Sequence, residues 1–520
     1  MNIIDKAISY VAPGMALRRQ RSRLLTNVLN ESGYGKHGAN GKKSSMAGWI
    51  TESGSALEDI EKNIPKLRER SRDLFMGAPL ASGALKRLRT NVIGPGLRLN
   101  AQVDAEVLGM TTEQADAWET KTEREFELWA ESIHCDLQRM NNFYQLQQLA
   151  FLSYLMSGDV FCLLPIKQRP NMPYDLRIQL IEADRINSSD DAFALSGSPR
   201  VFNGVEIDKD GEVVAYHISN RHPSSGFDQL ERIRVEKFGA ETGRQNILHL
   251  VELERPEQRR GVPMLAPVIE SMKQLARYSD AELMAAVVNA LYSVFITSES
   301  GTETDELGSI PSEDEIDSDN ETTYELGPGT VHFLGENEKI QEATPGRPNA
   351  NFDAFVTSMC RQIGAALEIP YEVLLGHFTS SYSASRGALL EAWKMFKMRR
   401  EWMASSFCQP IYEEFLSEAI AKGRIDAPGF FTDPTIRKAY ARAEWNGPSQ
   451  GQLDPLKEVR AASLRVDNGF TTRSQETVAL GGGNWFQNHE LRKIEEQARR
   501  DAGMSSAVVP EITEEPDDET

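Results

Sequence analysis

Two short runs of this sequence resemble ligand-binding motifs. Residues 33–38, Gly-Tyr-Gly-Lys-His-Gly, fit the GxGxxG pattern with which a strand–turn–helix unit holds a dinucleotide. No strand pattern precedes this run and no helix pattern follows it, so we interpret it as a flexible linker. The spacing of Asp317, Asp319 and Glu321 matches half of a calcium-binding loop. The sixth-position glycine and a properly placed final glutamate are missing, so we interpret this run as a solvated acidic loop.

Other residue types that carry chemistry do not form a recognisable site. Asp159 after Gly158 could be a catalytic acid, but a helix-to-strand turn capped by the aspartate is the simpler interpretation. The eight histidines show no HExxH spacing, and Walker-type GxxxxGK[ST], GxSxG and SxxK motifs are absent from the sequence. We therefore expect no catalytic residues, no metal site and no cofactor, and we do not expect an enzyme. Four cysteines without CxxC spacing predict buried free thiols: Cys135, Cys162, Cys360 and Cys408.

The charge of the chain is unevenly distributed. The 520 residues carry a net charge of −20, yet residues 1–100 contain 17 Lys and Arg against 8 Asp and Glu. Most of the chain would therefore repel a polyanion, because DNA binding relies on cations that displace counterions from phosphates. No apolar run reaches the roughly 20 residues that cross a bilayer, and the first residues lack a signal-peptide pattern. We expect no membrane association and expression in a cytoplasm.

Long helical patterns dominate the second half of the chain. Residues 263–297 and 349–369 place apolar side chains at three- and four-residue steps, and a helix of about 30 residues would reach ~45 Å. These patterns flank an acidic segment, 298–326, with eleven carboxylates and no Lys or Arg, which is typical of an exposed, mobile chain. A polar stretch then leads into a third helical pattern from 385 to 422, which Pro410 should kink.

The first half of the chain mixes helices and strands. Residues 1–50 are basic and Gly-rich, and Asp210-Gly211 lies between two apolar alternations, as in a β-hairpin. Short helices are predicted within 430–500, followed by a disordered acidic tail. We expect an α+β, predominantly helical fold. Helices are predicted at 55–75, 79–92, 111–132 and 138–157, and strands at 159–165, 176–181, 205–218 and 246–251.

Ordered sequence blocks over residues 60–500 resemble the lambda-like family of tailed-bacteriophage portal proteins. Their order and spacing carry the resemblance more than any one block does. The blocks are Asn91-Val-Ile-Gly-Pro-Gly96, Ser157-Gly-Asp-Val-Phe161, Ile181-Glu-Ala-Asp-Arg-Ile186, Gly204-Val-Glu-Ile-Asp208, Gln258-Arg-Arg-Gly-Val-Pro263, Ala365-Ala-Leu-Glu-Ile-Pro-Tyr-Glu-Val-Leu-Leu375, Ser381-Tyr-Ser-Ala-Ser-Arg386, Glu444-Trp-Asn-Gly447 and Asp454-Pro-Leu-Lys-Glu-Val459.

The resemblance implies a ring, usually of twelve subunits, at one capsid vertex of a virion assembled in the host cytoplasm. Double-stranded DNA would be packaged and ejected through its channel without sequence specificity. The implied partners are terminase, the major capsid protein or scaffold, and a head–tail connector, with no membrane. The implied regions are a flexible basic arm (1–50), wing (51–262), first stem helix (263–297), clip (298–348), second stem helix (349–369), tunnel loop (370–384), kinked tunnel helix and wing (385–425), crown (426–500) and disordered acidic tail (501–520).

Position in this scheme assigns the candidate DNA-facing residues. The resemblance places Thr379, Ser380, Ser381, Tyr382 and Ser383 in the tunnel loop, where hydroxyl groups would bond phosphates weakly without reading bases. An ordinary connection between two helices is the alternative for this stretch. For the whole chain, the alternatives are another phage structural or scaffolding protein without a DNA channel, and a soluble enzyme.

Overall fold

The computed structural model divides the chain into two compact units, Met1–Asp59 and Ile60–Thr520. Most of the predicted basic arm, including residues 33–38, lies outside the described residues, as do the acidic segment 298–326 and the tail from 505 on. In the first unit, the 3-10 turn η2 spans Ser44–Met46. The described residues are 14–15, 18–19, 21–22, 44–46, 51–188, 200–225, 230–290, 295–296, 332–333, 351–378, 381–450, 455–481, 483 and 485–504.

Helices account for about 57% of the structure and are accompanied by short sheets, which confirms the predicted α+β, predominantly helical class. Local signals set where the first core helices begin. Pro79 starts α4, since the first helical turn needs no N–H there. Capping boxes begin α6 and α7, with Thr111 and Asn142 as the N-caps. The helices are α3 (Ile64–Gly77), α4 (Pro79–Val92), α6 (Thr112–Ala130) and α7 (Phe143–Ser157).

The centre of the second unit contains a three-stranded antiparallel sheet in the order β3-β2-β8. Its central strand has both faces covered: Val160 and Cys162 lie in the main core, whereas Phe161 lies in a second core. This alternation follows from the two-residue period of a strand. The strands are β2 (Asp159–Leu163), β3 (Gln179–Glu182) and β8 (Ile247–Val251), which confirm three of the predicted strands.

The second core lies between β2 and a four-stranded antiparallel sheet in the order β4-β5-β6-β7. Val205, Tyr216 and Ile218 are buried there with Phe161. Gly211 in the turn between β5 and β6 has φ of 91°, as the predicted hairpin requires. The sequence did not predict the two outer strands. The bounds are β4 (Arg200–Phe202), β5 (Val205–Ile207), β6 (Val213–Ser219) and β7 (Arg232–Glu236).

Aromatic contacts join α12 (Gln409–Ala421) to this body. The Phe126 ring meets the rings of Phe143, Tyr412 and Phe415 edge-on, with centroids 5.5, 5.7 and 5.2 Å away. Each such pair contributes about 0.5–1.5 kcal/mol beyond its buried area. These contacts fix α12 against α6 and α7.

A second connection is the two-stranded sheet of β1 (Arg98–Ala101) and β11 (Ala443–Asn446). The other edge of β1 is covered by α6: the N–H groups of Ala101 and Val103 donate to the carboxylates of Glu123 and Glu119, at 3.0 and 2.8 Å. These side chains bond backbone N–H groups, in and just after β1, that β11 does not pair. The helix α13 (Pro434–Ala441) packs on α5 (Ala105–Leu108). The body therefore continues through Asn446.

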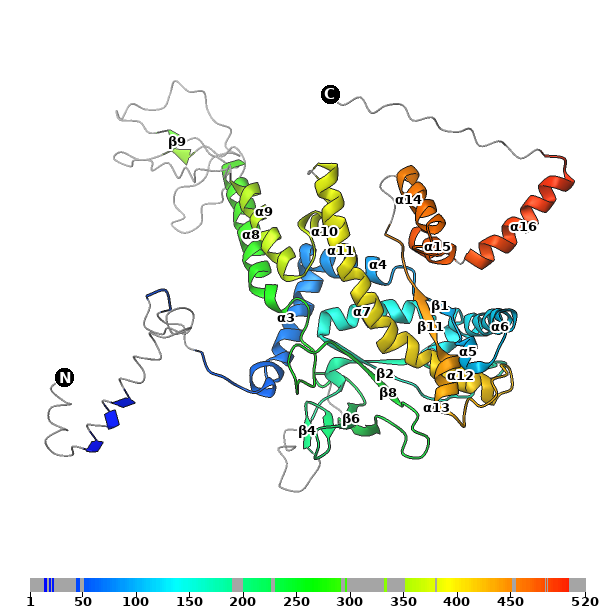
Figure 1. Ribbon diagram of the computed structural model, residues 1–520. Coiled ribbons are helices and arrows are strands. Elements are labelled where there is room, and N and C mark those ends of the chain that lie inside the picture. The colour runs from blue at the N-terminus through cyan, green and yellow to red at the C-terminus, as the bar shows by residue number, and fades with distance from the viewer. Residues whose placement is uncertain are drawn as a thin grey trace, which may run out of the picture. The chain divides into compact units, whose positions relative to one another are not determined.

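Long helices follow the sheets (Figure 1). The helices α8 and α9 pack side by side, and the short parallel pair β9 (Phe295–Ile296) and β10 (His332–Phe333) lies between them in the chain. The last helix ends at Asp501, and the predicted tail lies outside the described residues from 505 on. The bounds are α8 (Ile269–Ala290), α9 (Phe352–Ala366), α10 (Tyr371–Leu375), α11 (Tyr382–Met403), α14 (Pro455–Asp467), α15 (Arg473–Gly481) and α16 (Trp485–Asp501).

Candidate functional site

The helices α8 and α9 carry apolar side chains that the described residues leave exposed. Near its start α8 is anchored in the main core by Met272. Further along α8, the ring of Tyr278 stacks on the ring of Phe352 of α9, with centroids 5.5 Å apart. Five residues later the apolar side chains are no longer covered: Leu283 is 64% exposed, and Met284 is similarly exposed. The helix begins later than the predicted 263, because the 3-10 turn η7 (Ala266–Val268), which contains a proline, precedes it.

The predicted loop at 370–384 contains more helix than expected. Residues 371–375 form α10, which ends at Gly376 in a left-handed conformation. Ser381 is the N-cap of α11 and accepts a hydrogen bond from the Ala384 N–H at 3.4 Å. Of the predicted loop residues, Tyr382 and Ser383 therefore lie in the first turn of α11. Thr379 and Ser380 lie outside the described residues. Because α10 and the start of α11 occupy both ends of 370–384, the predicted extent of this loop is wrong.

The helical pattern predicted from 385 to 422 is interrupted before Pro410. A π-helical turn, η8 (Ala404–Cys408), separates α11 from α12. Pro410 lies in the first turn of α12, where its missing N–H costs least. The wider π turn accommodates the carbonyl that the proline ring would otherwise contact.

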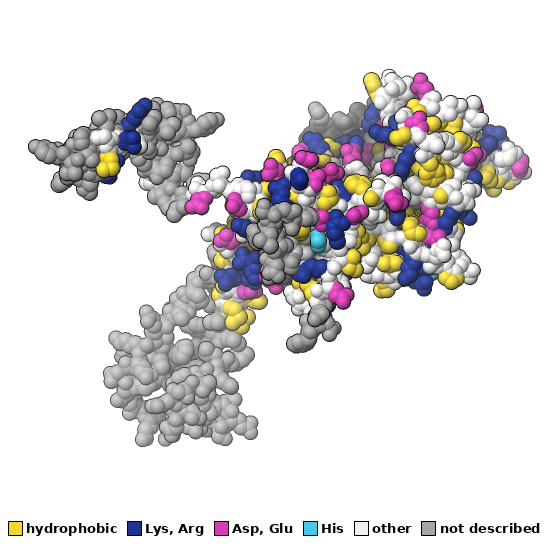
Figure 2. Space-filling model, turned by 90° about the horizontal axis from the view of Figure 1, so that it is seen from below, with side chains coloured by type: hydrophobic (Ala, Val, Ile, Leu, Met, Phe, Trp, Pro, Cys, Tyr) yellow, Lys and Arg dark blue, Asp and Glu magenta, His cyan; other side chains and the backbone are white. Residues whose placement is uncertain are grey.

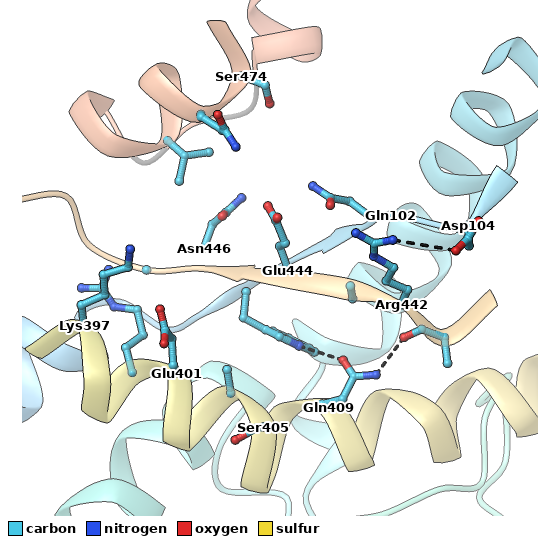
Figure 3. A pocket seen from close by; sticks show the side chains of 18 of the residues that line it. Gln102, Asp104, Lys397, Glu401, Ser405, Gln409, Arg442, Glu444, Asn446 and Ser474 are labelled. Carbon is cyan, nitrogen blue, oxygen red and sulfur yellow. Dashed lines mark hydrogen bonds and ion pairs between the residues drawn. The ribbon is translucent and has the colours of Figure 1, made fainter. Parts of the chain in front are cut away.

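A hollow of about 1520 Å³ lies between α11, β11 and α15 (Figure 3). Lys397 and Glu401 line it from α11 and Glu444 from β11, so charges of both signs face it. Gln409 accepts a hydrogen bond from the Trp445 indole N–H at 3.3 Å, which fixes one wall. The lining side chains that the structure describes do not place a nucleophile against a base. The hollow offers polar and charged contacts without catalytic geometry.

A buried ion cluster lies where the sequence predicted a capping aspartate. Gly158 is the C-cap of α7, whereas Asp159 begins β2 and is completely buried. Its carboxylate accepts bonds from Arg68 Nη2 at 2.6 Å and from Arg260 Nε at 2.7 Å, and His249 Nε2 lies 3.3 Å away. The predicted cap is therefore wrong, because long-range ion pairs decide the role of this residue.

The two arginines determine the charge state of this cluster. Burial opposes ionisation of Asp159, but the charges of Arg260 and Arg68 outweigh it and hold the pKa of the carboxyl well below its usual range. Burial lowers the pKa of His249 against the opposing effect of Asp159. Sequence reasoning missed these partners. The sequence carried one signal of this packing, the glycines at 158 and 261. Their backbones approach so closely that a Cβ on Gly261 would lie 1.9 Å from the Gly158 carbonyl oxygen.

The remaining candidate groups within the described residues do not form a reactive centre. All four cysteines are free and buried, as predicted, and burial raises the pKa of Cys135 to about 12. Among residues with described positions, His, Cys, Asp and Glu side chains nowhere gather in threes as a metal ion would require. Within the same part of the chain, no helix is both long and apolar enough to span a membrane.

Comparison with known proteins identifies the family. The model of the family described as phage portal protein, lambda family, matches residues 42–400. Portal protein B of Escherichia phage lambda is 23% identical over 499 residues and 92% of each chain. The portal protein of Escherichia phage N15 is 24% identical over 92% of this chain and 93% of its own. A solved chain from the neck of a native GTA particle, computed with C12 symmetry, covers 81% of this chain and 94% of its own at 12% identity, with a TM-score of only 0.37. The family match spans more than half of the sequence, and this chain belongs to the lambda family of phage portal proteins.

Proposed function

We propose that this chain is one subunit of a closed ring, of twelve copies as the resemblance implies, that forms a channel for double-stranded DNA at one capsid vertex. The observation that carries the proposal is the apolar surface of α8 and α9. Leu283, Met284 and Val287 lie within two helical turns and are 64, 62 and 42% exposed, and Phe355 of α9 is 46% exposed. Burying one such side chain contributes about 1.5–3 kcal/mol. In a ring, every copy could cover this surface on its neighbour.

The regions implied by the family extend this proposal to the rest of the chain. The helices α8 and α9 would be the two stem helices, and the clip would occupy 298–348 between them. The pairing of β9 with β10 supports this division, because it brings the chain before and after most of the clip together. The wing would comprise 51–262 together with α12, α13 and β11, which pack on it. The crown would then consist of α14, α15 and α16.

The channel would hold DNA loosely. The net charge of −20 disfavours tight binding to a polyanion. Figure 2 shows acidic and basic side chains interspersed over one face of the molecule, with hydrophobic ones scattered among them. Such a face has no field of one sign to grip phosphates. We place the DNA contact at the loop between Gly376 and Ser381, which keeps Thr379 and Ser380 as candidate contacts.

Partners and location follow from the family rather than from a described surface. We propose that the ring docks terminase during packaging and a head–tail connector afterwards. The basic residues of 1–50 would contact the ring's outer wing, while the major capsid protein or scaffold would seat the ring in the virion. Assembly would take place in the host cytoplasm.

Ring formation tests the proposal. In Leu283→Glu, a carboxylate replaces an apolar contact, and we expect rings to be lost in negative-stain images and replaced by single subunits in mass photometry. Leu128→Glu is a matched control, because Leu128 on α6 is 63% exposed but lies in the wing. Images of the unaltered protein without a central hole would refute the proposal, and rings formed by Leu283→Glu would refute the role of this surface.

A further inference from the structure

The helix α10 is too short to hold its own position. It contains five residues, Tyr371–Leu375, and isolated helices shorter than about 12 residues are marginal in water. Val373 and Leu374 are buried against neighbouring helices. These contacts fix one side of α10 and leave its two ends to be held by other groups. Arginines from distant parts of the chain lie at both ends.

Arg87, on α4, holds the C-terminal end of α10. Its Nη1 donates to the Val373 carbonyl oxygen at 2.5 Å, and its Nη2 donates to the Leu375 carbonyl oxygen at 3.3 Å. The last carbonyl groups of a helix have no partners within the helix and form the negative end of its dipole. A guanidinium group therefore bonds and neutralises this end. The support is rigid, because Leu85 and Leu88 of α4 are fully buried.

Gly376 marks the point where the chain leaves α10. Its φ of 69° is left-handed, and a Cβ at this position would lie 2.7 Å from Nη2 of Arg87. The guanidinium group thus occupies the space that a side chain at 376 would take. Glycine permits both the turn and the close approach of Arg87.

The N-terminal side of α10 carries an unusual residue, Glu368. Its φ of 57° is left-handed, although it is not a glycine. Its N–H donates to the Ala365 carbonyl, and the Ile369 N–H donates to the Gly364 carbonyl, which together form a helix end that normally uses glycine. This conformation has a steric cost for glutamate and persists where the surroundings determine it.

An ion pair with Arg399 on α11 explains why position 368 is a glutamate rather than a glycine. The Nη2 of Arg399 donates to the Glu368 carboxylate at 3.3 Å, and its Nη1 donates to Glu252 Oε2 at 2.9 Å and to the Tyr154 hydroxyl at 3.2 Å. Arg399 is only 9% exposed. It therefore connects the corner between α9 and α10 to α7 and to the end of β8. A glycine at 368 would relieve the backbone but lose this connection.

We propose that Arg87 is a positioning residue for the loop from Gly376 to Ser381, and that Arg399 fixes the opposite side of the same corner. The loop leaves α10 at a point held by Arg87 and returns at Ser381, the N-cap of α11. Arg399, near the other end of α11, ties the corner that precedes α10 to the body. The chain therefore leaves α10 at the same place in every subunit of a ring. The role of the loop toward DNA rests on the proposed function, whereas the clamp on α10 does not.

A spin label on assembled rings tests the clamp directly. His377 is exposed and follows Gly376, and the native cysteines are buried, so His377→Cys can be labelled selectively with a nitroxide. Adding Arg87→Met should shorten the rotational correlation time of the label by about twofold or more, because the end of α10 is released. Arg89→Met is the matched control: Arg89 is on the same helix, and no bond from it to α10 is present in the described structure.

Two further readouts separate a local clamp from general destabilisation. A label at Asp210→Cys, in the exposed β5–β6 turn, should not respond to Arg87→Met. Arg87→Lys keeps the charge but not the two-pronged guanidinium, so it should raise label mobility by less. It is the deciding variant if Arg87→Met does not assemble. Label mobility at 377 unchanged in the arginine variants that form rings would overturn the proposal.

The same rings distinguish failure of the clamp from failure of the proposed function. If Arg87→Met releases the label and also reduces the DNA that filled capsids retain, both inferences are supported. A released label with normal packaging would leave the clamp standing and refute contact between this loop and DNA. Because the label reports on rings without DNA, packaging results cannot alter the conclusion about Arg87.

Discussion

Glu123→Gln should stabilise the protein at alkaline pH. Burial, the largest cause, and the neighbouring Glu119 raise the pKa of Glu123 from its ordinary value of 4.5 to about 7, while the bond from the Ala101 N–H opposes this rise. A folded-state pKa above the unfolded one means that the folded protein holds a proton more tightly. The resulting stability is complete below about pH 4.5 and is lost as pH rises through about 7.

The size of this loss follows from the pKa. A rise from 4.5 to about 7 corresponds to about 3 kcal/mol when the carboxyl is ionised in both states. Glu123 retains some solvent contact, so we expect a cost of about 2 kcal/mol at pH 8. Glutamine stays neutral and keeps an oxygen that can accept the Ala101 N–H. The variant should therefore gain about 2 kcal/mol at pH 8 and little at pH 5.

Urea unfolding at one protein concentration, at pH 5 and pH 8, measures this difference. A fixed concentration is needed because subunit association contributes to apparent stability. Glu127→Gln is the matched control on the same helix: it removes an exposed ion pair with Arg98, 3.1 Å long, and should change stability by less than about 1 kcal/mol. An equal gain for Glu123→Gln at both pH values, or a loss at pH 8, would refute the reasoning.

Two other substitutions test the remaining assignments. Asp159→Asn leaves two buried guanidinium groups without a counter-charge and should lower the free energy of unfolding by about 3–5 kcal/mol at pH 7, measured by urea denaturation. A loss below about 1 kcal/mol would contradict the assignment of the cluster. Replacing Thr379 and Ser380 together with alanine should leave rings intact in negative stain and reduce the DNA retained in filled capsids. Replacing Ser224 and Ser225, which are exposed in the wing, with alanine is the control. Normal retention by the Thr379 and Ser380 double variant would contradict a DNA contact at these positions.

The sequence predicted the parts of the fold that local chemistry decides. The hairpin at Asp210-Gly211 formed because the turn needs a residue with positive φ, and α6 began at its Thr111 capping box. The short strands β1 and β11 were missed, since four residues are too few to show a period. The helix α10 was missed for a similar reason, because its five residues are too few to show a period, and Pro370 is its N-cap.

The candidate sites depended on contacts that no local pattern contains. Asp159 was interpreted as a cap because Gly158 precedes it, yet its role is set by Arg260, 101 residues further on. Arg87 contacts a carbonyl group 286 residues away. Such pairs require the three-dimensional arrangement of several helices and strands. The family resemblance indicated the function because the order and spacing of the sequence blocks could be recognised along the chain. It did not show which residues of different blocks contact one another in the fold.

Buried and half-buried arginines connect distant segments at several places in this body. Arg68 and Arg260 close the sheet region around Asp159, while Arg87 and Arg399 fix α10, and each donates at least two bonds between segments far apart in sequence. Lysine would not replace them, because a single ammonium group cannot reproduce the planar fork. Salt screens buried pairs less than exposed charges. In the proposed ring, apolar helix surfaces join the subunits and arginine bonds cross-link each body. High salt should therefore weaken surface contacts with charged partners while each subunit keeps its shape.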